Sequence, residues 1–308
     1  MADERFLVTG ALGCIGAWTC ALLAEEGTEV VGYDYGTDDR RLRLATDATI
    51  PLVQGDIVDG DALNRILDEH RITHVIHLAA LLLPQIKPNP PYGTAVNIGG
   101  TVNVLDAAKT RGIQVAYASS IAVYSSDDDR GGPVPNDAIG HPTTFYGVHK
   151  QACEGLARVF WHEERVPSIG IRPWIVYGPG RDNGLPASPT LAMAAAAKGE
   201  DYRISFGGRM QLQFAPDTAL VFISAARAAT EGARVFHLGG PVVSIAETAR
   251  EIEAAAPGVT ITVDEETILP FPEDFDGGPL DEAIGPISWT PLEEGVRRTI
   301  DRLRAAPG

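Results

Sequence analysis

Short apolar runs alternate with helix-patterned segments over the first 175 residues of the chain. The runs are apolar at successive positions, which is typical of parallel strands whose two faces are both covered by crossover helices. The segments between them carry helical periodicity at about residues 14–26, 61–69, 92–111 and 145–164. We therefore predict an α/β fold with a doubly wound parallel sheet of the Rossmann type. The six predicted strands are Phe6–Val8, Glu29–Tyr33, Ile50–Val53, His74–Leu78, Gln114–Ala118 and Ser168–Ile171.

The pattern changes after Tyr177, where a loop rich in Gly and Pro extends to about residue 189. Helices are expected at 190–198 and 216–231, and a further strand of the main sheet at 234–238. Thr290 precedes Pro291 and Glu293 in the order of a helix N-terminus, so Thr290 is expected to cap a final helix. We predict a dinucleotide-binding domain over 1–177, joined by 211–240, and a small substrate lobe over 178–210 and 241–308.

Charge and composition exclude several classes of protein. The 308 residues are 44% hydrophobic and carry a formal net charge of -16, which disfavours nucleic acid and anionic membranes as partners. The apolar runs are shorter than the roughly 20 residues of a membrane-spanning helix. With an acidic N-terminus that lacks the pattern of a secretion signal, the expectation is a cytoplasmic protein. Three scattered cysteines predict neither a disulfide framework nor a metal site.

The first strand is followed by a turn with glycines at Gly10, Gly13 and Gly16. Where side chains are absent, backbone N–H groups and the start of the next helix can approach a pyrophosphate closely, so the backbone of Cys14 and Ile15 belongs to the same candidate site. A tight strand-to-helix turn without a ligand has the same pattern. The glycines alone therefore do not establish nucleotide binding.

Acidic residues after the second and third strands strengthen the prediction of a dinucleotide site. Asp34 lies 18 residues after Gly16, where a carboxylate can bind the ribose hydroxyls of adenosine and repel a 2′-phosphate. This favours NAD over NADP, although Arg40 and Arg41 nearby could bind a phosphate. Asp56, followed by Ile57, is expected beside the adenine or as a turn cap. The small residues that end the fourth strand leave room for the ligand; they are Leu78, Ala79 and Ala80.

A tyrosine and a lysine occur four residues apart, at Tyr146 and Lys150, on one face of a predicted helix. A phenol with a pKa near 10 needs a neighbouring cation to act as a base near neutrality, and Lys150 can supply it. Ser120, at the end of the fifth strand, is expected to bind the substrate oxygen, with Ser119 as the competing candidate. A surface Tyr/Lys pair is the alternative interpretation.

In these motifs and their order the chain resembles the extended short-chain dehydrogenase/reductase family, the NAD-dependent sugar epimerases and dehydratases. The resemblance implies NAD as cofactor, catalytic roles for Ser120, Tyr146 and Lys150, and binding of the nicotinamide ribose by Lys150. It also places Asn97 and Pro173 beside the cofactor. A homodimer formed through the helices at 92–111 and 145–164 is implied as well. Further matching motifs are Gly100-Thr101, Val123-Tyr124, Arg172-Pro173 and Val176 to Gly180.

The chain departs from family members that act on nucleotide-diphosphate sugars, which bind the diphosphate with arginines. Met210 occupies one such position, with Arg209 one residue early, and residues 257–290 contain no Arg or Lys. We therefore expect a smaller substrate: a free sugar, a sugar acid or a related polyol. Arg181 is a candidate for a substrate carboxylate, or it stabilises its own loop. Ile121 and Ala122 replace the Asp-Glu pair of the dehydratases, which disfavours water elimination.

The predicted function is an NAD-dependent oxidoreductase or epimerase that transfers a hydride between a secondary alcohol and NAD, with Tyr146 as the general base. Dehydrogenase and epimerase chemistry are not separated at this stage. A nucleotide-sugar epimerase with tightly bound NAD, an NADPH-dependent carbonyl reductase and a non-catalytic dinucleotide sensor remain alternatives. The sensor has no need of Tyr146 and Lys150.

Overall fold

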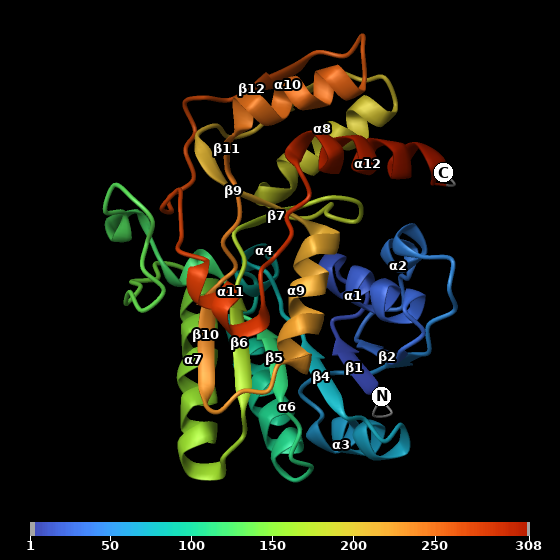
Figure 1. Cartoon of the computed structure of the whole chain (residues 1–308), viewed down its shortest axis with the longest axis vertical. Coiled ribbons are helices and arrows are strands. Elements are labelled where there is room, and N and C mark those ends of the chain that lie inside the picture. The colour runs from blue at the N-terminus through green and yellow to red at the C-terminus, as the bar shows by residue number, and fades with distance from the viewer. Residues whose placement is uncertain (1–3, 307–308) are drawn as a thin grey trace.

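The computed structural model describes residues 4–306 and contains a seven-stranded parallel sheet (Figure 1). The strand order is β10-β6-β5-β4-β1-β2-β3, and every neighbouring pair is parallel. This confirms the predicted Rossmann-type α/β fold. The strands are β1 (Arg5–Thr9), β2 (Glu29–Asp34), β3 (Leu52–Gln54), β4 (His74–His77), β5 (Val115–Ala118), β6 (Ser168–Arg172) and β10 (Ala233–His237).

Helices cover both faces of this sheet, and each face has its own apolar core. Phe6 and Val8 of β1 pack into the cluster formed with α1 (Cys14–Glu25) and α9 (Ala215–Arg227). Leu7 points to the opposite face of the sheet and packs into a second apolar cluster there. Successive residues of one strand are therefore buried on opposite sides, which explains the continuous apolar runs. The opposite face is covered by α3 (Gly60–Glu69), α6 (Gly100–Lys109) and α7 (Phe145–Glu164).

The remaining helices of the first half are short and lie between the main elements. They are α2 (Arg40–Ala45), α4 (Leu83–Ile86) and α5 (Pro90–Thr94). The single helix expected over 92–111 is divided: α5 continues through a π-helical turn at Ala95–Gly99 into α6. Pro90 and Pro91 are tolerated in α5 because the first turn of a helix needs no hydrogen-bonded N–H there.

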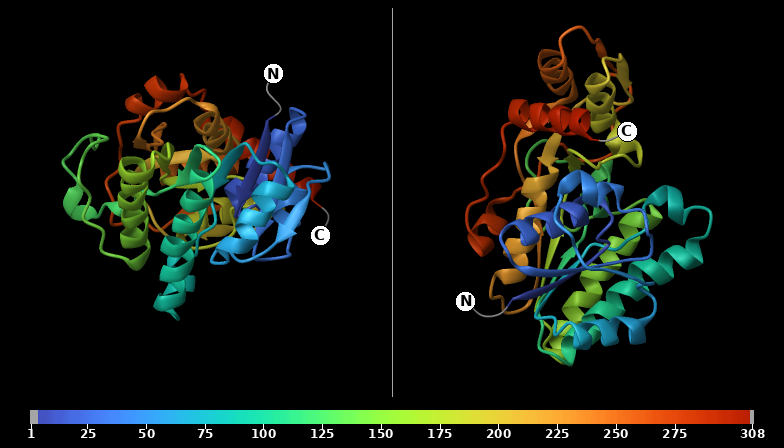
Figure 2. Two further views of the ribbon diagram at one scale, coloured as in Figure 1. Left: turned by 90° about the horizontal axis from the view of Figure 1, so that it is seen from below. Right: turned by 90° about the vertical axis from the view of Figure 1, so that its right-hand side faces the viewer.

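A second lobe stands above the carboxyl ends of the large sheet (Figures 1 and 2). Its core is built between two small sheets and three helices. Strand β9 leads directly into α9, which returns the chain to the large sheet beside α1. A further helix, α11 (Gly278–Ile284), packs against the large domain. The lobe contains β7 (Ile175–Tyr177), β8 (Tyr202–Ile204), β9 (Arg209–Phe214), β11 (Val242–Ser244), β12 (Ile261–Val263), α8 (Ser188–Ala197), α10 (Ile245–Ala255) and α12 (Leu292–Ala305).

The start of α12 differs from the prediction. The N-cap position is occupied by Pro291, and no side chain caps the helix. Thr290 instead donates from its backbone N and its Oγ1 to the carboxylate of Asp217, at 2.7 and 2.9 Å. Asp217 lies in the first turn of α9 and is buried, so a tertiary acceptor has replaced the local cap.

In the described part of the chain, 4–306, no helix combines the length and apolarity needed to cross a bilayer.

Candidate active site

The glycine turn between β1 and α1 brings the backbone close to the end of β4. Gly10 has a φ of +72°, and a Cβ at this position would lie 2.7 Å from the backbone N of Ala79. A Cβ on Gly16 would collide with the carbonyl oxygen of Gly10. The turn therefore requires glycine at both positions. The free N–H groups at the start of α1 form the kind of cradle that suits a dinucleotide pyrophosphate.

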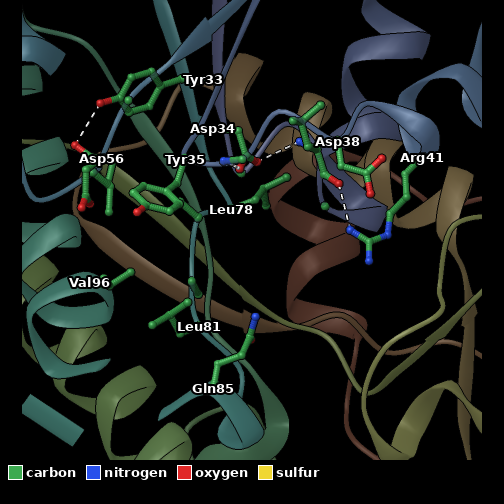
Figure 3. A pocket seen from close by; sticks show the side chains of 18 of the residues that line it. Tyr33, Asp34, Tyr35, Asp38, Arg41, Asp56, Leu78, Leu81, Gln85 and Val96 are labelled. Carbon is green, nitrogen blue, oxygen red and sulfur yellow. Dashed lines mark hydrogen bonds between the residues drawn. The ribbon is translucent and has the colours of Figure 1, made fainter. Parts of the chain in front are cut away.

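A cleft of about 340 Å³ opens beside this turn, along the ends of β1, β2 and β4 (Figure 3). Asp56 and Tyr35 lie on one side of it and Arg41 on the other. Tyr35, Gln85 and Tyr92 line the cleft but were not predicted, since residues in a loop or in helices of four or five residues carry no periodic signal. The predicted cofactor residues that line the cleft are Gly10, Gly13, Asp34, Asp56, Ile57, Leu78, Ala79 and Ala80.

Asp34 is held by the glycine turn itself. Its Oδ2 accepts from the backbone N of Leu12 at 2.9 Å, and its Oδ1 accepts from Gly36 N at 3.0 Å. The carboxylate is therefore fixed at the cleft wall, where it would disfavour a 2′-phosphate on an adenosine ribose. Arg41, which could have bound such a phosphate, donates instead to Leu12 O at 3.1 Å and to Asp182 Oδ1 at 2.6 Å.

Two further predicted residues shape the cleft through the backbone. Asp56 accepts from Val58 N at 3.1 Å, and its own carbonyl accepts from Tyr33 Oη at 2.9 Å. Asn97 is buried and bonds both the N and the O of Leu81, at 2.7 and 3.0 Å. Leu81 lines the cleft and Asn97 does not. Asn97 thus supports the cleft wall from behind.

Among the residues predicted to be catalytic, Ser120 follows the end of β5, and Lys150 joins this strand end to Tyr146; none of the three lines the cleft. Lys150 is buried and donates from Nζ to Ala118 O at 2.6 Å, and its Nζ lies 5.6 Å from the ring centroid of Tyr146. Ser120 Oγ accepts from Ala122 N at 3.1 Å, which fixes the hydroxyl in the turn after the strand. Gly147 packs directly on the Ala122 carbonyl. A side chain there would push α7 away from the turn.

The two adjacent serines have different surroundings. Ser119 is 2% exposed and donates from Oγ to Glu154 Oε1 at 2.5 Å, so its hydroxyl is engaged inside the protein. Ser120 has no such buried carboxylate partner among residues 4–306. Pro173, at the end of the neighbouring strand, accepts from Ile121 N at 3.1 Å. These contacts favour Ser120 over Ser119 as the group that faces a substrate.

Arg181 lines a second cleft of about 990 Å³ between α2, α8 and α12, together with Arg41 and Asp182. Burial raises the pKa of the Cys14 thiol to about 12, and the positive charges of Arg181 and Arg41 oppose this rise. Arg181 is therefore close to the N-terminus of α1. Its Nε is buried and has no hydrogen-bond partner within residues 4–306.

His77, at the end of β4, is a polar residue of the core. Its Nδ1 lies 2.7 Å from Thr9 Oγ1 and its Nε2 lies 3.2 Å from Thr101 Oγ1. Burial, together with the charge of Lys150, lowers its pKa from 6.5 to about 3. The unfolded chain therefore binds a proton between these two pH values that the folded protein excludes. The contribution of His77 to the free energy of unfolding is therefore fully present above pH 6.5 and is lost as the pH falls.

We expect His77→Asn to remove part of this acid sensitivity. Between pH 7 and pH 5 the wild-type histidine should lose about 2 kcal/mol of the free energy of unfolding. Urea unfolding at both pH values measures the difference, which should be smaller by about that amount in the variant. His162→Asn changes an exposed histidine and should keep the wild-type difference. An equal loss in His77→Asn and wild type would contradict the assignment.

Similar proteins support the class that the fold and the site define. A Rossmann sheet with a glycine turn beside its cleft is characteristic of an enzyme of the extended short-chain dehydrogenase/reductase type. Residues 6–239 match the model of the NAD dependent epimerase/dehydratase family, and the chain belongs to that family. NAD is accordingly its cofactor. No group of three or more His, Cys, Asp or Glu side chains within 4–306 is placed to hold a metal ion.

Individual relatives differ in what they act on. UDP-glucuronate 4-epimerase 6 of Arabidopsis thaliana is 33% identical over 184 residues, which is 56% of this chain and 40% of that protein. UDP-glucose 4-epimerase of Mycolicibacterium smegmatis is 29% identical over 97% of this chain and 98% of its own length. A GalE-like L-threonine dehydrogenase from Cupriavidus necator superposes with a TM-score of 0.86, at 23% identity over 97% and 100% of the two chains. The structural likeness establishes the fold.

Proposed function

We propose that the protein is an NAD-dependent dehydrogenase or epimerase that acts on a secondary alcohol of a small hydroxylated substrate, such as a sugar, a sugar acid or a related polyol. The observation that carries this proposal is the position of Lys150, whose Nζ lies 5.6 Å from the Tyr146 ring centroid and donates to Ala118 O, two residues before Ser120. A dinucleotide sensor would need the cleft alone.

Each of these residues has a defined task in the proposed reaction. Ser120 binds the substrate hydroxyl and orients it. Tyr146 removes the proton from that oxygen, and the ammonium of Lys150 stabilises the phenolate form that does so. Ala118 holds Lys150 by accepting one of its three N–H groups, which prevents the flexible side chain from leaving the phenol. NAD, when bound, accepts the hydride.

The proposed small size of the substrate is supported by the lobe. Met210 is 2% exposed and packs in the lobe core, so it offers no charge to a ligand. Arg209 is exposed, and its Nε lies 3.8 Å from Glu273. The segment that contains Glu273, residues 271–276, is acidic and is anchored by Gln211, which donates to Asp274 Oδ1 at 2.8 Å. Such a segment repels a diphosphate.

We therefore expect neither UDP nor GDP to bind the NAD-loaded protein with a micromolar dissociation constant. Isothermal titration calorimetry measures this directly, and NAD binding to the same preparation is the positive control. Low-micromolar binding of UDP would contradict a small substrate and favour the second candidate, a nucleotide-sugar 4-epimerase. That candidate has support in the full-length similarity to UDP-glucose 4-epimerase.

A substrate panel tests the reaction itself. Aldoses, uronates and L-threonine are incubated with protein and NAD, and NADH release is followed at 340 nm. L-Threonine is included because of the Cupriavidus necator dehydrogenase. Release of NADH with one member of the panel identifies a dehydrogenase. Conversion of a sugar to its epimer without free NADH, detected by chromatography, identifies an epimerase, and no conversion of any member contradicts the proposed substrate class.

We also propose that the protein is a homodimer formed through α7 and the neighbouring α6. Phe145, Val148 and Val159 of α7 are each about half exposed, which is unusual for apolar side chains on one helix. Sedimentation equilibrium should give twice the chain mass of 32.7 kDa. Val148→Glu should shift the equilibrium toward the monomer, whereas Leu220→Glu, a change at an exposed position of α9, should not. A monomeric wild-type protein would contradict this interface.

A further inference from the structure

The helix that carries Tyr146 and Lys150 also carries a buried glutamate. Glu154 follows Lys150 by four residues, so all three side chains lie on the same side of α7. Glu154 is 6% exposed and Arg172 is 8% exposed. Arg172 Nε donates to Glu154 Oε1 at 2.7 Å, and Nη2 donates to Oε2 at 2.8 Å. This is a bidentate ion pair, the geometry in which the two charges bind most strongly.

Stability alone does not explain a buried ion pair. Removing two charges from water costs several kcal/mol per ion, and apolar residues of similar volume commonly stabilise a protein as well or better. The remaining donors of Arg172 are also engaged: Nη1 donates to Tyr124 Oη at 2.8 Å and to Asn136 O at 3.3 Å. The Arg172 guanidinium is thus fixed by contacts on both sides. Because Arg172 is fixed, it holds the Glu154 carboxylate in one orientation.

That orientation is used at the end of β5. Glu154 Oε1 accepts from the hydroxyl of Ser119 at 2.5 Å, and Ser119 N donates to Ile171 O at 2.7 Å. Ser119 lies between Ala118, whose carbonyl binds Lys150, and Ser120. Ser119, in the middle of residues 118–120, is therefore fixed through its side chain as well as its backbone. Ser120, on one side of Ser119, belongs to the proposed catalytic set, and Ala118, on the other side, holds Lys150.

We propose that Glu154, held by Arg172, is a positioning residue: through Ser119 it fixes the end of β5, and so keeps the Lys150 ammonium against Tyr146 and the Ser120 hydroxyl in place. The proposal rests on the proposed function of Tyr146. Because Coulomb energy falls with distance, a looser Ala118 carbonyl allows the ammonium to move away and weakens its effect on the phenol. The consequence is slower removal of the substrate proton.

Steady-state kinetics on a substrate identified by the panel test this, with kcat and KM determined separately. Ser119→Ala removes the hydroxyl, and Glu154→Asp shortens the carboxylate; both keep every charge. We expect each variant to lower kcat by about threefold or more and to leave KM within about twofold of wild type, because the variants disturb the groups that remove the proton and not the substrate contacts. NAD affinity, measured by calorimetry, should stay within about fivefold, since the glycine cleft is unchanged.

Matched variants separate positioning from a general loss of stability. Ser168→Ala removes a buried hydroxyl of β6 that has no hydrogen-bond partner within residues 4–306. Glu163→Asp shortens an exposed glutamate of α7. Both controls should keep the wild-type kcat. A wild-type kcat in Ser119→Ala and Glu154→Asp would overturn the positioning role, and Ser119→Ala decides alone if the aspartate variant does not fold. Wild-type turnover in Tyr146→Phe would contradict the proposed function itself.

Discussion

Tyr146→Phe is expected to lower turnover by about a thousandfold and to leave NAD binding within twofold of wild type. The substitution removes only the oxygen that accepts the substrate proton. The NAD cleft is lined by residues of other elements, among them Gly10, Asp34 and Leu78. Steady-state kinetics on a substrate identified by the panel and calorimetry with NAD measure the two effects separately.

A matched substitution controls for this first prediction. Tyr202→Phe makes the same chemical change in β8 of the lobe, on the strand that pairs with β12, and should retain wild-type turnover. Turnover above about a tenth of wild type in Tyr146→Phe would show that another group removes the proton, since general-base catalysis contributes at least a hundredfold. Loss of NAD binding together with turnover would instead show that Tyr146 is needed to form the cofactor site.

Gly16→Ala is expected to weaken NAD binding by about two orders of magnitude. The new Cβ would meet Gly10 O, and it would lie 2.9 Å from Ala11 Cα. These are backbone atoms of the pyrophosphate turn, which cannot rotate away as a side chain can. Overpacking of this kind costs about 1–3 kcal/mol, and each 1.4 kcal/mol corresponds to a tenfold change in affinity. Calorimetry with NAD measures the dissociation constant.

Gly99→Ala is the matched control for the glycine turn. Gly99 lies in the π-helical turn before α6, and no described atom lies within 4 Å of its Cβ position. Its substitution should leave the NAD dissociation constant unchanged and slightly favour the helix. Wild-type affinity in Gly16→Ala would show that the close packing of the glycine turn is not needed for NAD binding.

Much of the architecture was predictable from periodicity. The apolar runs located the first six strands to within about two residues, and α7 has the predicted bounds, Phe145–Glu164. Spacing was equally informative for Tyr146 and Lys150, because four residues nearly complete one helical turn. The glycine turn and Asp34 were also accessible, since both lie at the ends of neighbouring strands. These features depend on residues near each other in the chain.

Other features depended on partners far away in the chain. Thr290 has the pattern of a helix cap, yet it bonds Asp217, 73 residues earlier. Arg41 was a candidate phosphate ligand, yet it binds Asp182, 141 residues later. In both cases the local pattern was compatible with two partners. Packing of the lobe against the large domain selected one of them.

The sequence by itself therefore determined the α/β class, the dinucleotide turn and the paired tyrosine and lysine, because each follows from a fixed local geometry. Only the tertiary structure decided that the hydroxyl of Ser119 is engaged by Glu154, and that Arg181 lies near α1. The spacing of Lys150 and Glu154 placed both on one helix face, but only the approach of β6 supplied Arg172 as the partner. Long-range partners are selected by packing, which a local pattern does not encode.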